Sequence, residues 1–223
     1  MIIKINQTAS NIKQEYEIEG DSFCFRGKAG SFSPFQNIVV SNKTDTISGI
    51  FHFSPLVNYI PFRHLFGKTC LSRAFCLYKN NIEYGSIAYS KDGLYKNCYI
   101  ITLNSGEVLN CYALSKGSYD YVSVYQGDKQ IALIETYLSV NDYKYKHKLY
   151  LLDDYKAFYE VLPFFAVYYS SFTFAQRQHM TYASSTRSGV VWDFSGYRHK
   201  YDPNWRETNF PHENFFGKTN LFE

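Results

Sequence analysis

Residues 155–174, YKAFYEVLPFFAVYYSSFTF, form an apolar stretch that decides the fold, because the sequence before it is divided into short strand-like runs. About 20 apolar residues are enough to cross the hydrocarbon core of a bilayer, so the stretch is either a membrane span or a helix buried in a protein core. Lys156 and Glu160 stand four residues apart near its start, which is typical of an exposed first helical turn. Tyrosines are spread through the stretch, whereas membrane spans concentrate them at the interfaces. We therefore favour the buried helix, with the membrane span and a pair of strands as alternatives.

The helix is expected to cover residues of about 154–174. Asp153 and Asp154 stand where an N-cap and an anionic first turn are preferred, since negative charge compensates the positive end of the helix dipole. Pro163 would then lie in the helix interior, where it removes one backbone hydrogen bond. The sequence therefore predicts a buried helix that is kinked at Pro163.

Residues 1–152 alternate strand-like runs with turn signals at intervals of roughly ten residues, a spacing that is typical of meandering antiparallel sheets. Asn, Asp and Gly supply the turns, for example at residues 79–81, 104–106 and 126–128. One helix covers a large open sheet poorly, whereas a sheet closed around the helix buries it on all sides and leaves no exposed edge. We predict a mainly β fold, in which a closed antiparallel barrel surrounds a central hydrophobic helix.

The composition limits the class of protein. Hydrophobic residues make up 45% of the 223 residues, so the chain is not disordered, and 22 Tyr and 19 Phe favour β-structure. A net charge of +3 is only mildly basic, and nucleic acid is not an expected partner. The 5 cysteines contain no C-x-x-C pair and predict neither disulfides nor a zinc site; each is most simply a small buried hydrophobe. The N-terminus does not resemble a signal peptide, so we expect a cytoplasmic protein.

The order of these elements resembles the tubby C-terminal-like superfamily, especially its LURP-one-related and phospholipid-scramblase branch. The most specific part is residues 121–165, where YVSVYQGDKQIALIETYL is followed by YKYKHKLYLLDDYKAFYEVLPFF. The positions that match the family's turn-then-strand signature are Gly127, Ile131, Ala132 and Ile134. Asp153 or Asp154 matches the acidic residue that opens the family's helix, and residues 16–30 are similar to its first hairpin.

The resemblance implies a barrel of about twelve strands, threaded by the helix, over residues 1–174. Residues 175–223 would be an irregular, aromatic-rich extension, which we expect to pack against the barrel. In tubby proteins the barrel binds phosphoinositide head groups, and scramblase-like relatives have been linked to membranes and lipid. The family's phosphate-binding motif aligns with no particular residues here, so none is carried over. Pro163 and the long extension depart from the family's pattern.

The best candidate for anion binding is the run YKYKHK at residues 143–148. On a strand its lysines project from one face, where three ammonium groups could meet a phosphorylated lipid head group. These lysines are Lys144, Lys146 and Lys148. The alternative is a solvated outer face whose lysines protect the strand from aggregation. His147 would face the other side, as a lining or core histidine. A second basic cluster contains Arg63, His64, Lys68 and Arg73, with an ordinary surface loop as the alternative.

Enzyme signatures are absent from the sequence. The Gly-Lys-Thr runs at residues 67–69 and 217–219 lack the earlier glycine of a phosphate-binding loop, because Phe62 and His212 occupy that position. No G-x-S-x-G elbow occurs, and no two histidines stand at the spacing of a helical metal site. We therefore expect no catalytic residue, no metal and no cofactor.

These observations favour a non-catalytic intracellular binding or scaffold module, cytoplasmic or peripheral to a membrane. Its partner would be a phosphoinositide or another anionic lipid head group, or a protein. One alternative is a membrane-tethered scramblase-like protein with residues 158–174 inserted. Another is a hydrolase whose signature is not recognisable in the sequence.

Overall fold

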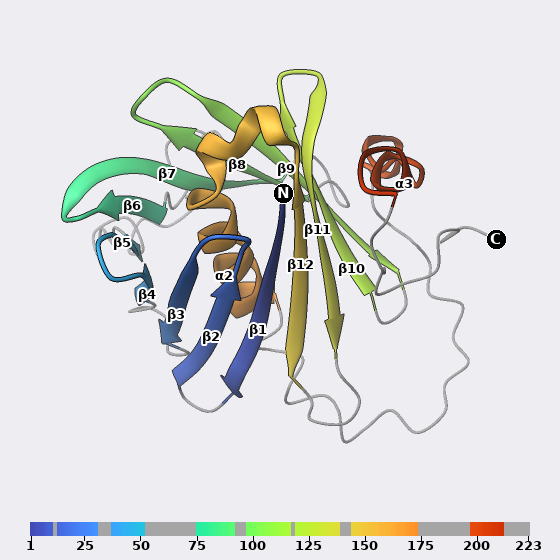
Figure 1. Ribbon diagram of the computed structural model, residues 1–223. Helices are drawn as coiled ribbons and strands as arrows, with labels where there is room; N and C mark the ends of the chain where they lie inside the picture. Colours follow the sequence, from blue (N-terminus) through green and yellow to red (C-terminus); the bar gives the residue numbers. More distant parts are fainter. Residues whose placement is uncertain are drawn as a thin grey trace, which may run out of the picture.

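In the described part of the chain, twelve strands form a closed antiparallel barrel, which confirms the predicted fold class (Figure 1). The structure is a computed structural model that describes residues 1–10, 13–30, 37–51, 75–91, 97–116, 119–138, 144–173 and 197–211. Each strand pairs with its neighbours in sequence, and β1 pairs with β12 to close the barrel. The strands are β1 (Ile2–Ser10), β2 (Lys13–Glu19), β3 (Cys24–Gly30), β4 (Asn37–Ser41), β5 (Thr46–Phe51), β6 (Phe75–Lys79), β7 (Ile82–Lys91), β8 (Asn97–Leu103), β9 (Val108–Lys116), β10 (Tyr119–Gln126), β11 (Lys129–Leu138) and β12 (Tyr145–Leu151).

The N-terminal strand β1 closes the barrel between β12 and β2. Its alternation of Ile3 and Ile5 with polar residues is a strand signal, and both isoleucines are fully buried. The Met1 ammonium donates to the carbonyl oxygen of Leu151 at 2.9 Å and pairs with the Asp153 carboxylate at 3.0 Å. These contacts join the first residue of the chain to the end of β12.

The predicted hairpin turns at residues 79–81, 104–106 and 126–128 are present. Asn80 and Asn81 adopt φ angles of 51° and 67°, and Gly106 and Gly127 have φ angles of 100° and 59°. Asn and Gly tolerate these left-handed angles, which two-residue hairpins require. Local turn chemistry therefore places these strand ends.

The central helix begins later than the sequence analysis predicted. Residues Asp153–Phe158 form a short 3-10 helix (η2), and the α-helix α2 covers Val161–Thr173. Pro163 consequently lies in the first turn of α2 and not in its interior. The first amides of a helix have no intrahelical partner, so proline costs little there. The predicted interior kink at Pro163 is therefore wrong.

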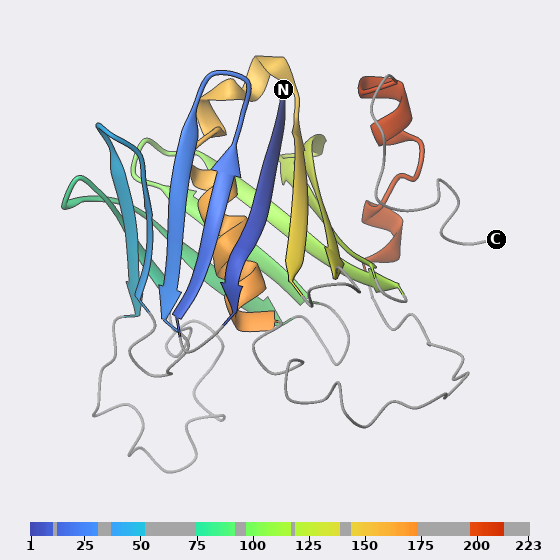
Figure 2. The same ribbon diagram turned by 60° about the horizontal axis from the view of Figure 1, so that its bottom comes forward.

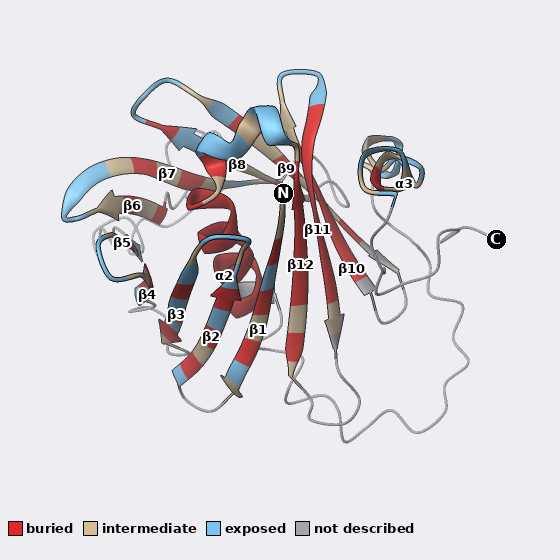
Figure 3. Cartoon of the chain, viewed as in Figure 1, coloured by how far each residue is buried: buried red, intermediate tan, exposed pale blue. Residues whose placement is uncertain are grey.

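The α2 helix occupies the barrel interior, and its described side chains are buried (Figure 3). The wall approaches it most closely at glycines: a Cβ atom at Gly49 would collide with the rings of Phe75 and Phe164. A Cβ at Gly27 would lie 3.4 Å from Val167 Cγ2. Small residues in the wall thus leave room for the aromatic side chains of the helix. Within the described ranges, no helix is both long and apolar enough to cross a membrane.

The two ends of the barrel differ. The odd-numbered strands and α2 all finish at one end, which we call the helix-exit end (Figure 2). At the opposite end, the turn end, the described hairpin turns and η2 connect the elements (Figure 1). The position of a residue along its strand therefore tells whether it lies nearer the helix-exit end or nearer the turn end.

The C-terminal residues that the structure describes lie against the outer wall of the barrel. They include a 3-10 helix, η4 (Arg198–Lys200), and a short α-helix, α3 (Trp205–Asn209). Tyr201, Trp205 and Phe210 pack against a buried outer cluster of the sheet. The contact is with the wall of the barrel.

The cysteines divide into two groups. Cys98 and Cys111 are buried, as predicted, but Cys24 is exposed and Cys76 is partly exposed. Cys24 stands at the start of β3 with its side chain on the outer face, so the expectation of a buried residue was wrong there. Cys70 lies outside the described residues.

Candidate functional site

A group of lysines gathers on the outer face of the barrel near its helix-exit end. Its members, which we call the basic rim, are Lys13, Lys28, Lys144 and Lys146. Lys13 belongs to β2, Lys28 to β3 and Lys146 to β12, and Lys144 directly precedes β12; these strands are neighbours in the barrel through β1. Lys13 and Lys28 are exposed, and Lys144 and Lys146 are partly exposed. Exposed residues alternate with buried ones in β2 and β3, which turns Lys13 and Lys28 outward, and Lys146 stands between the buried Tyr145 and His147 of β12.

Two acidic side chains lie level with these lysines, Glu15 beside Lys28 and Glu17, which pairs with Asn6 on β1 as Lys146 does from the other side. The Glu15 carboxylate accepts from the Lys28 ammonium at 3.4 Å. Lys146 instead has two uncharged cross-strand neighbours, Asn6 on β1 and Tyr137 on β11. The four ammonium groups of the basic rim thus outnumber the two carboxylates level with them, and this part of the face carries a local positive charge.

The half of the same face nearer the turn end is electrostatically balanced. There Lys4 stands opposite Glu19 on β2 and Lys148 on β12, and Lys148 stands opposite Glu135 on β11. Opposite charges in directly paired positions attract each other and cancel at a distance. The positive potential of this face is therefore concentrated at the helix-exit end.

The three lysines predicted from the sequence do not share one environment. Lys144 directly precedes β12, and Lys146 and Lys148 lie on its outer side, but Lys148 is only 5% exposed. Its ammonium group lies 5.5 Å from the centre of the Tyr150 ring, and Glu135 is its cross-strand neighbour on β11. Lys144 and Lys146 therefore belong to the basic rim, and Lys148 belongs to a covered part of the wall.

Sequence reasoning did not bring Lys13 and Lys28 to this site. They are 116 or more residues away from Lys144 in the chain, and only the closure of β1 onto β12 makes them neighbours. The second predicted cluster, Arg63, Lys68 and Arg73, lies outside the described residues.

His147 faces the barrel interior and is 1% exposed, in agreement with its predicted role as a core histidine. Its Nδ1 atom lies 2.8 Å from Thr136 Oγ1, and its Nε2 atom has no hydrogen-bond partner in the described part of the chain. Burial disfavours the charged imidazolium and lowers the pKa of His147 to about 3. A neutral imidazole is consistent with packing inside the barrel.

The buried histidine makes the stability of the fold depend on pH. Because the pKa of His147 in the folded chain is lower than its usual 6.5, the unfolded chain binds a proton first as the pH falls. The stability that the neutral, buried His147 contributes to the folded chain is complete above pH 6.5 and is lost as the pH falls from 6.5 to about 3. Between pH 7 and pH 5 we expect the free energy of unfolding to fall by about 2 kcal/mol from this group.

Urea denaturation of the chain and of a His147→Gln variant at both pH values measures this effect. Glutamine keeps a polar group next to Thr136 and cannot be protonated in this range. The variant should therefore lose about 2 kcal/mol less than the parent chain over this interval. Equal losses would show that His147 is not the group responsible.

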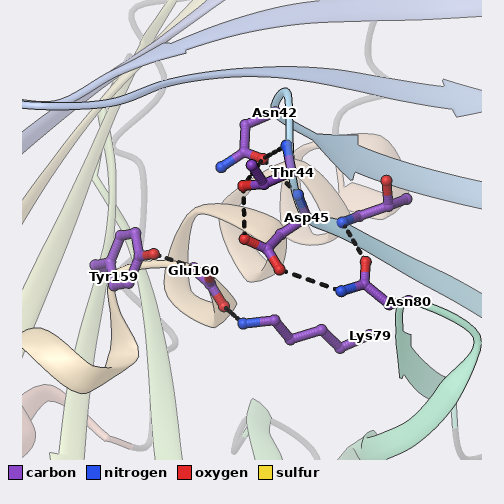
Figure 4. A network of polar contacts seen from close by, with 8 residues as sticks. Asn42, Thr44, Asp45, Lys79, Asn80, Tyr159 and Glu160 are labelled. Carbon is purple, nitrogen blue, oxygen red and sulfur yellow. Dashed lines mark hydrogen bonds and ion pairs between the residues drawn. The ribbon is translucent and has the colours of Figure 1, made fainter.

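A polar network at the turn end holds the start of the central helix (Figure 4). The Lys79 ammonium pairs with the Glu160 carboxylate at 2.5 Å, and the Tyr159 hydroxyl donates to the same carboxylate at 2.8 Å. In the adjoining turns, Asn80 Nδ2 donates to Asp45 at 3.1 Å. These groups bind one another, so the arrangement is that of a structural clamp and not of a ligand site.

In the described ranges, no three His, Cys, Asp or Glu side chains are grouped so that they could hold a metal ion. Comparison with models of protein families, with curated proteins and with solved structures found no match for this chain.

Proposed function

We propose that this chain is a non-catalytic binding module of tubby-like fold that recognises anionic lipid head groups at its basic rim. The order of elements supports the tubby-like assignment: twelve antiparallel strands close around a helix that follows them. The observation that carries the functional proposal is the concentration of Lys13, Lys28, Lys144 and Lys146 at one end of an otherwise balanced face.

The physical basis is attraction between lysines and a negatively charged membrane surface. Each lysine near such a surface contributes about 1 kcal/mol, and the contribution falls off within a Debye length of about 8–10 Å. Lys146 suits this role because its paired neighbours, Asn6 and Tyr137, are uncharged. The helix-exit end would face the membrane, and α2 would stay inside the barrel, so binding needs no insertion.

Replacing Lys144 and Lys146 together by serine tests the proposal. Removing two surface lysines should weaken binding to vesicles that contain phosphatidylserine or phosphoinositide by about 2 kcal/mol, or about 30-fold. Co-sedimentation with vesicles at low salt measures the affinity, and binding to neutral phosphatidylcholine vesicles provides the baseline.

The matched control replaces Lys43 and Lys129, two exposed lysines, by serine. Both stand beside hairpin turns at the turn end, and the variant has the same net charge as the rim variant. It should bind anionic vesicles as tightly as the parent chain does. Equal weakening by both variants would show that net charge alone acts, and an absence of binding by the parent chain would end the proposal. A preparation that is monodisperse without detergent would argue against the membrane-tethered alternative.

A further inference from the structure

The outer wall formed by β10, β11 and β12 has a chemistry different from that of β2 and β3. In β2 and β3 exposed residues alternate with buried ones, whereas β12 is buried along most of its length (Figure 3). Tyr121, Leu133 and Tyr150 form the buried outer cluster of this wall. We call these three side chains, together with Glu135 between them, the tail-covered face.

Residues 197–211 occupy this face as a short docked segment. Its aromatic anchors are Tyr201, whose ring lies 5.3 Å from that of Tyr121, and Phe210, whose ring lies 5.3 Å from that of Tyr150. Trp205 also packs on the cluster. Aromatic anchors of this kind, together with arginine, dominate the binding energy of protein interfaces.

An ion pair lies at the centre of the contact. The Arg206 guanidinium donates to Glu135, and both side chains are almost completely buried. The Tyr150 hydroxyl donates to the second carboxylate oxygen of Glu135 at 3.0 Å. A buried carboxylate requires a cation and hydrogen bonds, so the face selects a segment that presents arginine at this position.

The connection between this segment and the rest of the fold is long. Residues 174–196 separate the end of α2 at Thr173, at the helix-exit end, from Tyr197. The helix that delivers Trp205 and Arg206 has only 5 residues. The docked segment is therefore short, and 23 residues of sequence separate it from α2.

We propose that the tail-covered face is a docking site for a segment of a partner protein that presents an arginine flanked by aromatic side chains, and that residues 197–211 are its intramolecular competitor. The proposal does not depend on lipid binding at the basic rim. A competitor on the same chain is always present beside the face, so a partner must displace it before it can bind. Weakening the competitor should therefore raise the affinity for a segment supplied in trans.

The test uses the full chain and a fluorescent synthetic peptide with the sequence of residues 197–211, YRHKYDPNWRETNFP. An Arg206→Ala chain, whose own segment lacks the cation, should bind the peptide at least about tenfold more tightly than the parent chain, as measured by fluorescence anisotropy. A peptide with alanine in place of Arg206, and with Arg198 kept, should bind the Arg206→Ala chain at least about tenfold more weakly than the native peptide does. A Glu135→Gln, Arg206→Ala chain should bind the native peptide at least about tenfold more weakly than the Arg206→Ala chain does.

A second variant is used if the first one does not fold. If circular dichroism shows that the Arg206→Ala chain is unfolded, a Trp205→Ala, Phe210→Ala chain keeps the ion pair intact and loses two anchors, and it should show the same gain. Either folded variant that binds the native peptide no more tightly than the alanine peptide would overturn the docking site. Equal affinity of the parent and variant chains for the native peptide would overturn the competition.

Discussion

Replacing Phe164 by alanine is expected to lower the free energy of unfolding by about 3–5 kcal/mol, the range measured for large aromatic side chains deleted from protein cores. Phe164 is fully buried on α2, and its ring lies 6.2 Å from that of Phe75 on the barrel wall. Gly49 stands next to both rings, where any side chain would collide with them. Deleting the ring therefore leaves a cavity that the wall cannot fill with an existing side chain.

Urea denaturation followed by circular dichroism measures the loss. An Ile82→Ala variant serves as the control, since Ile82 is 73% exposed at the β6–β7 turn and should change stability by less than about 0.5 kcal/mol. Phe164→Leu should cost less than Phe164→Ala, because leucine fills part of the volume. A cost below about 1 kcal/mol for Phe164→Ala would mean that the helix is not an integral part of the barrel core.

Much of the fold follows from local patterns in the sequence. Alternating hydropathy and the turn residues Asn80, Asn81 and Gly127 place the hairpins, because each hairpin depends on a few neighbouring residues. The long apolar stretch identifies the one element that must be enclosed. Closure of the barrel then follows from a packing argument, since a single helix cannot cover an open sheet.

The start of the helix and the coverage of the outer wall depend on contacts that are distant in sequence. Asp153 pairs with the N-terminal ammonium group and does not cap α2. The α2 helix begins only at Val161. The sequence does not distinguish Lys146 from Lys148, since both are lysines at alternate positions of the same run. Their surroundings differ because residues 197–211 dock against Tyr150, next to Lys148, and because Glu135 is the β11 neighbour of Lys148. A single sequence contains no local signal for either fact.

The clamp at the turn end is expected to make Lys79→Met the second most damaging of these changes. Glu160, at the entry to α2, has a side chain that is 7% exposed, and its carboxylate is paired with the Lys79 ammonium at 2.5 Å. Removing the lysine leaves a buried carboxylate with the Tyr159 hydroxyl as its remaining donor in the described part of the chain. Breaking a buried pair in this way costs about 3–5 kcal/mol, and we expect about 3 kcal/mol because the Lys79 side chain is 33% exposed.

Lys79 is more exposed than Glu160, so the two single variants should differ in cost if the effect comes from a buried charge. Glu160→Gln should cost only about 1 kcal/mol, because a partly exposed lysine can turn toward water while a buried glutamate cannot. The double variant Lys79→Met, Glu160→Gln should therefore be more stable than Lys79→Met alone, as measured by urea denaturation at pH 7. The hydrogen bond to Glu160 raises the pKa of Lys79 above its usual 10.5, so the ammonium is charged throughout this experiment. Equal costs for the two single variants would mean that the pair acts as an ordinary surface ion pair, and that the start of α2 is held by apolar packing alone.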